Sequence, residues 1–514
     1  MTRKLFITGL TVLFSLGMQA QTAYDALRFS QIFYTGTARS AAMGNAMTAL
    51  GGDFGSLSIN PAGSAVYPYT ELIFTPALHA TANNSDYLAS GSSESRLRPG
   101  ITNVGYVTSV RAAGFGLSFA VGYNGLNQYT DRFSATGVTN QSSWLASLAY
   151  ETDGIFAQNM DWNDQQNPFR NGSAPWRSVL AWNTSLLDTL VGTGGMLYKA
   201  ATEAESGYDI FIPGNLRQNF YRNVNGNVGE YLINMGVNIG NTLFMGANLG
   251  LQSIWYDYRE AYSETAERPN DFAQTAFQGF THHYRQTTSG VGVNLKFGVI
   301  FLPVDNLRLG AGISTPTWMR LHDEWQESMD AHFSDGYNPP EIKSPLGEYD
   351  YRINTPFRWN VGLAYTFGVY GALSVDYEQT AYDKTKMLPW ERHAHQNPFS
   401  EENTTIRQGF QKAGNLRAGL ELNPNEMFSL RGGYAWYQNP EKHHGSDTHI
   451  GSLGIGLRAG TFFSDLTFMQ RFAQTENFSL YGNVYDGNQL IYQAPVGSQT
   501  SSNWKLLLSL GLRF

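Results

Sequence analysis

The histidines are the side chains of this sequence with the most evident capacity for coordination chemistry. Two groups are close together in the chain, His393 with His395, and His443 and His444 with His449. Imidazole is the commonest metal ligand in proteins, so such groups could bind haem or a divalent metal ion. Histidine is equally at home in solvated loops, which is the favoured interpretation, and no metal ligand is assigned. All ten histidines lie in or beside long polar stretches of the chain: His79, His282, His283, His322, His332, His393, His395, His443, His444 and His449.

Asp376 and Glu378 are the clearest candidates for an acid–base pair. Residues two apart on a β-strand share a face, so both carboxylates would point to the same side, where acid and base catalysis is feasible. The sequence contains no G-x-S-x-G, complete G-x-G-x-x-G or H-E-x-x-H motif, so the common hydrolase, dinucleotide and zinc-protease signatures are missing. A polar lumen lining is the favoured reading of the pair. We expect no enzyme activity, no catalytic residue and no cofactor.

Composition narrows the class of protein further. The chain of 514 residues has no cysteine, only 15% charged residues, 14% aromatic residues and 54 glycines. The lack of cysteine argues against a disulfide scaffold and against thiol chemistry. A net charge of -8 gives no footprint for nucleic acid. Many aromatic residues and glycines with little charge are typical of a membrane β-barrel.

The final stretch, Trp504 to Phe514, shows the element that must carry these side chains. Its even-numbered residues are all apolar or aromatic, whereas Lys505, Ser509 and Arg513 lie among the odd-numbered ones. This period of two predicts a β-strand with one apolar face. Taken alone, such a strand fits a barrel wall between lipid and a polar lumen as well as the edge of a soluble sandwich.

The same alternation recurs along the chain in pairs joined by short turns, which predicts repeated β-hairpins. Seven strands begin near residues 70, 114, 243, 307, 371, 427 and 462, and seven return near 100, 231, 287, 355, 410, 450 and 503. An even count of 14 suits a single-chain barrel in which the last strand pairs with the first. The long polar segments on the other side are expected to be extracellular loops, at 79–99, 125–230, 259–286, 319–351, 383–407, 438–449 and 473–502.

The beginning of the chain predicts export. Arg3 and Lys4 precede a short apolar run, and small or polar residues follow to Ala20, which is the layout of a cleavable signal peptide over residues 1–20. No later run of 18 apolar residues is present, and the mean hydropathy is -0.30. A membrane-spanning protein of this kind must therefore span as a closed barrel, here residues 69–514, in the bacterial outer membrane.

Two segments do not alternate. Residues 21–68 are rich in small side chains and too few to form a core of their own, so we expect a small helical hatch inside the barrel lumen. Residues 125–230 are treated as one large extracellular excursion with short helices, although residues 142–150 fit either a helix or a strand. Aromatic residues at strand ends are interpreted as membrane-interface girdles: Trp255, Tyr256, Tyr258, Trp318, Tyr382, Trp436 and Tyr437.

Several motifs together resemble one family. Asn60-Pro61-Ala62-Gly63 follows a glycine-rich approach and precedes the first strand, and GAGISTPTWM (310–319), Asn354-Thr355-Pro356, LSVDYE (373–378), NLRAGLE (415–421) and LRGGY (430–434) occur later. The combination is similar to the FadL/TodX-type transporters of the outer membrane, over nearly the whole mature chain. Ser64 departs from the family's pattern, which usually continues with an apolar residue.

The resemblance implies a 14-stranded barrel blocked by an N-terminal hatch. It also implies that a hydrophobic compound, such as a long-chain fatty acid, binds among the extracellular loops and leaves sideways through the wall. The hatch residues carried over are Asn60, Pro61, Ala62 and Gly63, for which a plain turn before the first strand is the alternative. Ligand contacts are predicted on the excursion, where packing among loop helices is an equal alternative: Trp144, Leu145, Leu148, Trp182, Leu186 and Leu187. Deleting residues 142–190 should then abolish ligand capture while the barrel still folds.

The substrate stays open at this stage. A haem-binding receptor and a surface barrel without transport are the alternatives, separable by haem absorbance and by uptake of a labelled long-chain compound. The expected partners are a hydrophobic small molecule and outer-membrane lipid, with no nucleic acid, and the protein is expected to be a monomer. Four arginines expected to face the lumen could meet an anionic head group: Arg308, Arg417, Arg431 and Arg458.

Overall fold

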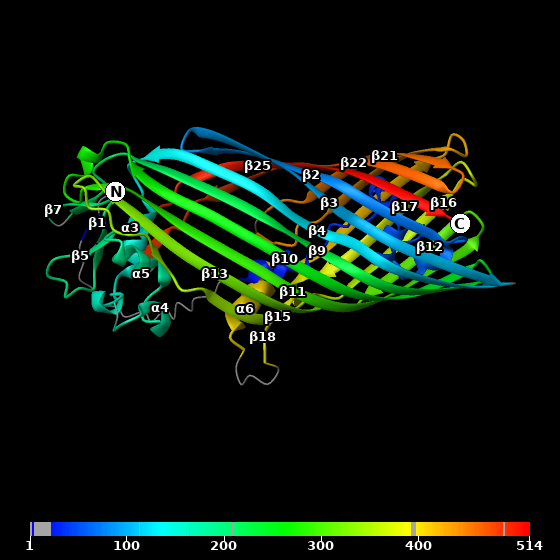
Figure 1. Cartoon of the computed structure of the whole chain (residues 1–514), viewed down its shortest axis with the longest axis horizontal. Coiled ribbons are helices and arrows are strands. Elements are labelled where there is room, and N and C mark those ends of the chain that lie inside the picture. Colours follow the sequence, from blue (N-terminus) through cyan, green and yellow to red (C-terminus); the bar gives the residue numbers. More distant parts are fainter. Residues whose placement is uncertain are drawn as a thin grey trace.

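The computed structural model of the chain is a long, closed, antiparallel β-barrel with a helical lobe at one end (Figure 1). The structure describes residues 3–4, 22–112, 114–163, 165–207, 209–391, 397–443, 445–486 and 489–514. Most of the expected signal peptide, together with His393, His395 and His444, lies outside the described residues.

The barrel wall has fourteen strands, as the sequence predicts. Three of them are interrupted, so that β12 and β13, β15 and β16, and β17 and β18 each form one wall strand. The first and last strands close the barrel, from Glu71 opposite Arg513 to Asp86 opposite Ser498. The wall strands are β2 (Glu71–Tyr87), β3 (Ser90–Ala112), β4 (Phe115–Thr139), β9 (Leu216–Ile239), β10 (Leu243–Ala266), β11 (Phe277–Val304), β12 (Leu307–Ser314), β13 (Trp318–Phe333), β15 (Gly347–Asn354), β16 (Arg358–Thr366), β17 (Gly371–Ala381), β18 (Lys386–Pro389), β19 (Lys412–Leu422), β20 (Phe428–Tyr437), β21 (Thr448–Ala459), β22 (Phe462–Ser479) and β25 (Val496–Arg513).

The strands are longer on one side of the barrel than the sequence predicts. β11 has 28 residues and β3 has 23, whereas β20 has 10. Residues 79–99, expected to be a loop, belong to β2 and β3, which are joined by a turn at Leu88 and Ala89. That prediction was wrong because these strands are polar on both faces beyond the membrane, so the alternation that reveals a strand is lost.

An outward-facing apolar band surrounds the part of the barrel farther from the helical lobe, at the right in Figure 1. We call this the lower part of the barrel, and the part nearer the lobe the upper part. On β11 the exposed side chains Val291, Val293, Leu295, Phe297 and Phe301 face outward. Beyond them the same face continues with exposed Ser289, Arg285 and His283. This change from apolar to polar marks the edge of the membrane-spanning band; we call the strand parts beyond it the outer extension.

The helical lobe, residues 140–215, forms a cap over the outer extension. The excursion is shorter than residues 125–230 because β4 and β9 continue into it, and residues 144–150 lie in helix α3. Its elements are α3 (Trp144–Thr152), η3 (Ala157–Asn159), α4 (Pro168–Asn171), α5 (Trp176–Asn183), β5 (Leu187–Thr189), β6 (Tyr198–Ala200), β7 (Ala204–Ser206) and β8 (Asp209–Phe211), and β1 (Arg3–Lys4) pairs with β8.

A buried carboxylate attaches the cap to the outer extension. Glu264 of β10 accepts hydrogen bonds from the Trp144 backbone N–H at 2.8 Å and from the Ser143 hydroxyl at 2.5 Å, at the start of α3. Gln218 of β9 donates to the same carboxylate at 2.9 Å. Burial raises the pKa of the Glu264 carboxyl above its ordinary value, while these donors act in the opposite direction.

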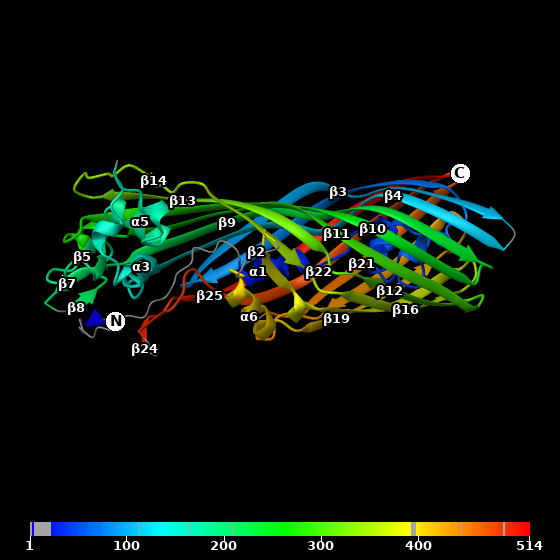
Figure 2. The same ribbon diagram turned by 90° about the horizontal axis from the view of Figure 1, so that it is seen from below.

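Smaller elements cover the remaining loops: η4 (Pro269–Phe272), β14 (Ile342–Lys343), η5 (Tyr382–Lys384), α6 (Ser400–Gly409), β23 (Val484–Asp486) and β24 (Gln489–Tyr492). Helix α6 lies beside the N-terminal helix α1 (Ala23–Ser30) (Figure 2), where Tyr24 meets Phe410 edge to face. No helix in the described part of the chain is long and apolar enough to cross a membrane.

Residues 22–66 run inside the barrel, and we call them the luminal segment (Figures 1 and 2). After α1 the segment forms α2 (Ala38–Ala42) and two turns of 3-10 helix, η1 (Phe54–Ser58) and η2 (Pro61–Val66). Nearly every residue from 38 to 66 is buried. The non-alternating, small-residue composition of this stretch therefore corresponds to a chain packed within a lumen.

Candidate functional site

Lumen-facing glycines let the luminal segment touch the barrel wall. A Cβ at Gly298 would lie 1.7 Å from Asn60 Oδ1, and a Cβ at Gly246 would lie 2.3 Å from the Pro61 carbonyl oxygen. A side chain at either position would occupy the space of the luminal segment. The high glycine content of the sequence is in part explained by this contact.

The four expected hatch residues lie together at the bottom of the luminal segment, and all are buried. Asn60 Nδ2 donates to the Thr48 carbonyl at 2.6 Å and to the Val299 carbonyl of β11 at 3.1 Å. Its Oδ1 accepts from the Ala62 N–H at 3.0 Å, which caps η2. Asn60 thus joins two turns of the segment to the wall; its role in gating stays a prediction.

Ion pairs join the same half of the luminal segment to the barrel wall. Arg39 of α2 pairs with Glu421 of β19 at 2.8 Å, and Arg431 of β20 bridges Glu421 at 2.6 Å and Asp465 of β22 at 2.5 Å. The side chains of Glu421, Arg431 and Asp465 are almost fully buried, and that of Arg39 is 14% exposed. Such an arrangement is costly to break, because a lone buried charge would remain.

The carboxylates considered for acid–base chemistry are also used in packing. Asp376 accepts from the Thr48 N–H at 2.7 Å, and Glu378 pairs with Arg358 at 2.7 Å and with Arg417 at 3.1 Å. Both carboxylates are fully buried. Asp376 and Glu378 thus belong to the polar lining of the lumen, which is the interpretation that the sequence favours.

The four arginines proposed for an anionic head group are also placed by the structure. Arg431 and Arg417 are engaged in these ion pairs, and Arg308 donates to the Leu50 carbonyl at 2.7 Å. Arg458 is exposed. They do not form a common site.

The wall has a seam between β3 and β4. These strands pair only from Ala112 opposite Phe115 to Asn103 opposite Asn124. Above that point residues 90–101 of β3 pair with β2, and residues 127–139 of β4 pair with β9. Within the described chain, no ladder joins the upper parts of β3 and β4.

Side chains bridge the seam instead. Arg98 of β3 donates to Asn225 of β9 at 2.9 Å and lies over the Trp255 ring at 5.7 Å. Arg96 makes a similar hydrogen bond to Asn223. Bulges at Thr102 and Leu126 accompany the separation, one and two residues beyond the last pair, Asn103 with Asn124.

The upper luminal segment is bonded to β4 at this seam. The Phe33 N–H donates to the Leu126 carbonyl at 3.0 Å, and the Thr35 N–H donates to the Gly125 carbonyl at 3.4 Å. The Tyr129 hydroxyl donates to the Arg28 carbonyl at 2.7 Å. We call residues 31–35 the strap. A shift of α1 and the strap would therefore act directly on β4, which borders the seam.

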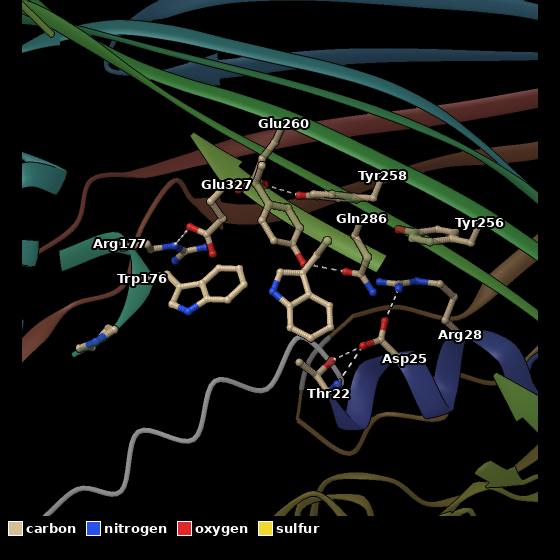
Figure 3. A pocket seen from close by; sticks show the side chains of 13 residues that line it. Thr22, Asp25, Arg28, Trp176, Arg177, Tyr256, Tyr258, Glu260, Gln286 and Glu327 are labelled. Carbon is tan, nitrogen blue, oxygen red and sulfur yellow. Dashed lines mark hydrogen bonds and ion pairs between the residues drawn. The ribbon is translucent and has the colours of Figure 1, made fainter. Parts of the chain in front are cut away.

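A cavity of about 470 Å³ lies between α1 and the cap (Figure 3). Thr22, the N-cap residue of α1, and Asp25 and Arg28 of α1 line it on one side. Arg177 and Glu327, paired at 3.2 Å, line it on the other. Aromatic rings fill most of the remaining wall: Trp176, Tyr256, Tyr258, Tyr284 and Trp325.

Glu327 is held on two sides in this cavity, by Arg177 and by His282. Burial alone would raise the pKa of its carboxyl, but the hydrogen bond with His282 at 2.9 Å and the charge of Arg177 outweigh burial and keep the pKa below its ordinary value. The carboxylate is therefore ionised at neutral pH and anchors α5 to β13.

A smaller cavity of about 270 Å³ adjoins the first. The two cavities share Arg177, Tyr258 and Glu260 as lining residues, and the second adds Phe133, Trp144, Phe220 and Phe478. We call the pair the outer vestibule. It combines aromatic rings with a few charged groups, as pockets for small amphiphilic molecules commonly do.

No protein-family model matches the sequence, and no curated relative matches it. Among solved structures, the P. putida toluene transporter TodX is similar over 93% of this chain and 98% of its own, with 13% identity and a TM-score of 0.50. A Pseudomonas aeruginosa FadL homologue is similar over 94% of this chain and 100% of its own, with 10% identity and a TM-score of 0.54.

The chain has the FadL/TodX-type fold. The fold expected from the sequence motifs is thereby confirmed.

Within the FadL/TodX-type fold, only one predicted ligand residue lines the outer vestibule. Trp144 lines the smaller cavity and stacks on Phe280 at 5.7 Å. Trp182 lies elsewhere on the cap, where its indole donates to Asp161 at 2.8 Å. The four leucines are buried in the shared core of the cap and the outer extension: Leu145, Leu148, Leu186 and Leu187. Contact of these residues with a ligand stays a prediction.

The described histidines do not gather into a metal-binding cluster in this FadL/TodX-type barrel. His443 lines a cavity near the strap, and His449 is hydrogen-bonded to the Tyr434 hydroxyl at 2.6 Å. His282 is bonded to Glu327, and His322 to Asp350 at 2.8 Å. In the described ranges, no group of three or more His, Asp or Glu side chains is arranged to hold a metal ion.

Sequence reasoning missed most of the outer vestibule. Tyr256 and Tyr258 were expected in a membrane girdle, but their rings line the cavity, and Tyr256 is 3% exposed. Their alternation with Trp255 and Asp257 is the signal that could have placed them on an inward face of a longer strand.

Proposed function

We propose that this protein is an outer-membrane transporter that takes up hydrophobic small molecules, with long-chain fatty acids as the reference class. The luminal segment acts as a hatch, and the substrate leaves sideways through the wall. The observation that carries the proposal is the combination of a blocked axis with the seam between β3 and β4. The names of the structural neighbours support it, since one is a toluene transporter and another a FadL homologue.

The axial route is poor for any substrate. Residues 38–66 are packed against the glycines of the wall and held by buried ion pairs, so a passage through the lumen would require that half of the segment to leave. A lateral passage requires the strap and α1 to move and the side-chain bridges of Arg96 and Arg98 across the seam to open.

A lateral route also fits a hydrophobic substrate energetically. Each CH₂ group moved from an apolar surface into water costs about 0.8 kcal/mol. A compound that passes from the aromatic outer vestibule along Tyr129 and Tyr256 to the seam keeps contact with apolar surface. Tyr129 and Tyr256 meet edge to face at 5.6 Å beside Phe29 of α1, which puts these rings between the vestibule and the seam.

The remaining expectations form part of the same proposal. The signal peptide directs the chain to export, Trp144 contributes to capture, and the protein acts as a monomer in outer-membrane lipid. The apolar band on β11 and its neighbours is the surface that this lipid would cover.

Cross-linking tests the lateral route, because the chain has no cysteine of its own. A Cβ at Gly100 of β3 would lie 3.9 Å from Gln128 Nε2 of β4, across the seam. We expect a bifunctional thiol reagent on G100C/Q128C to reduce uptake of radiolabelled oleate and toluene by roughly tenfold, because the gate can no longer open. A reducible linker should restore uptake.

The matched control ties the same two strands where they already pair. Val110 of β3 lies opposite Leu117 of β4 in the ladder, and both side chains face outward. Cross-linked V110C/L117C should transport normally. Equal uptake by both cross-linked variants would exclude the seam as the exit.

A further inference from the structure

A separate cavity of about 630 Å³ lies beside the strap and shares no lining residue with the outer vestibule. The strap residues Gln31 and Phe33 line it, together with the outer ends of β20, β22 and the chain between β20 and β21. Its size is within the usual range for small-molecule sites. The proposed hydrophobic route does not use it.

The lining of this cavity is rich in carboxamides and hydroxyls. Six amide side chains and three hydroxyl side chains contribute to it: Gln31, Asn415, Gln438, Asn439, Gln474, Asn477, Ser446, Thr448 and Thr475. A carboxamide donates and accepts hydrogen bonds at once, as a hydroxyl does. In the described chain, the side-chain amides of Gln31 and Asn477 make no hydrogen bond within the protein.

Aromatic rings form part of the same surface. Phe33 and Tyr437 meet edge to face, with ring centroids 5.1 Å apart, and both line the cavity. A sugar ring has hydroxyls at its edge and C–H groups on its faces, so it needs polar partners around it and an apolar plane beneath it. Amides around aromatic rings supply both.

One cation in this cavity makes no close ion pair among the described residues, although the charge of Glu476 acts on it from a distance. Arg471 of β22 lies over the Phe33 ring at 5.3 Å, and its Nη2 donates to Thr448 at 2.8 Å and to Gln474 at 3.0 Å. No ion pair joins Arg471 to a carboxylate in the described chain, although Glu441 and Glu476 also line the cavity. Its Nε and Nη1 groups remain for an anion, and a guanidinium suits a carboxylate or phosphate.

We propose that this cavity binds an acidic sugar, either free or carried by a glycolipid. The ring lies against Phe33 and Tyr437, its hydroxyls bond to Gln31, Gln438 and Asn477, and its carboxylate or phosphate pairs with Arg471. A purely hydrophobic compound is a poor occupant, because it would leave the amides and the guanidinium without partners.

Binding by the full-length protein in detergent tests this site without reference to transport. The probes are glucuronic acid and glucose, which differ in one carboxylate. By calorimetry we expect glucuronic acid to bind roughly tenfold more tightly than glucose, and Arg471→Gln to remove that preference. Asn477→Ala, at an exposed position, should weaken the binding of both sugars without altering folding, because the Asn477 side-chain amide makes no hydrogen bond in the described chain.

The control is Arg259→Gln, which makes the same charge change on an exposed arginine outside the cavity and should leave binding unchanged. Mass spectrometry of lipids that co-purify with the wild-type and Arg471→Gln proteins separates the two sources. An acidic glycolipid lost with Arg471 identifies a membrane-borne sugar, whereas calorimetric binding without such a lipid identifies a free one. Absence of both, or a preference that survives Arg471→Gln, overturns the proposal, and oleate uptake can succeed or fail independently.

Discussion

The two halves of the luminal segment are held by different means. Residues 38–66 are buried against wall glycines and fixed by Asn60 and by the Arg39–Glu421 ion pair. Residues 22–35 make hydrogen bonds to β4 and bury apolar side chains such as Leu27 and Phe29, but among the described residues no ion pair joins them to the wall, and Tyr24 of α1 is 49% exposed.

This difference indicates which half can move. Displacing the lower half would leave buried charges unpaired and open the space that its glycine contacts fill. Displacing the upper half breaks hydrogen bonds of about 1 kcal/mol each and disturbs the apolar packing of α1, but it separates no ion pair with the wall among the described residues. The upper half also borders both the outer vestibule and the seam. A gate is therefore best sought in α1 and the strap.

The largest effect is expected from filling the space of the lower half. Gly298→Leu places a side chain where Asn60 lies, and overpacking of this kind costs about 1–3 kcal/mol or more. We expect a clear fall in the denaturant midpoint of the purified barrel. Gly409→Ala, where an added Cβ meets nothing within 4 Å, should behave like the wild type; equal midpoints for the two variants would contradict the close contact.

A slightly smaller effect is expected from breaking the lower ion pair. Arg39→Gln leaves Glu421 with Arg431 alone, and removal of one partner from a buried pair costs about 3 kcal/mol at most here, because Arg39 keeps some contact with solvent. Denaturant unfolding measures it, with Arg259→Gln as the surface control. An unchanged midpoint would mean that the lower half is not fixed by charge.

In the upper half, a mild change should affect transport more than stability. Tyr129→Phe removes the hydrogen bond to the Arg28 carbonyl, worth about 1 kcal/mol, and retains the ring. We expect the rate of oleate uptake to change several-fold while the unfolding midpoint stays near that of the wild type. If stability falls and uptake does not change, α1 is as fixed as the lower half.

The smallest effect is expected at the Arg177–Glu327 ion pair that lines the outer vestibule. Because the folded-state pKa of Glu327 is depressed, its contribution is complete above its ordinary pKa of about 4.5 and is lost as the pH falls through the lower folded-state value. Arg177 is 46% exposed, so the pair contributes less than about 1 kcal/mol.

Tryptophan fluorescence can follow this loosening, since Trp176 and Trp325 lie 6.1 Å apart beside the pair. We expect a change in emission below about pH 4.5 that is absent in Glu327→Gln. The same acid transition in both proteins would assign it to another carboxylate.

Much of the fold was predictable because the membrane imposes a simple pattern. Leu508, Leu510 and Leu512 are exposed, whereas Leu507 and Ser509 are buried, as the alternation of the last strand predicts. The outer extension was not predictable in this way, because water on one side and a wet vestibule on the other leave polar residues on both faces, as in residues 79–99.

The candidate site was predicted less well than the fold. The position of Asn60 follows from a local motif, but the roles of Leu145 and Tyr256 depend on which distant strands face each other. Leu145 is in the core of the cap, and Tyr256 is in the cavity. Neither the seam nor the strap contact at Leu126 leaves a pattern in the sequence, since both are made by backbone groups.

Closure of the barrel by its first and last strands has a consequence for assembly. Glu71 and Arg513 are hydrogen-bonded across 442 positions of the chain, and the luminal segment precedes them all. The luminal segment packs closely against the glycines of the wall, so it cannot enter a barrel that has already closed. The segment must already lie against the growing sheet when β25 meets β2, so the order of folding is set by the contents of the lumen, and contacts this distant in sequence make the last step a slow one.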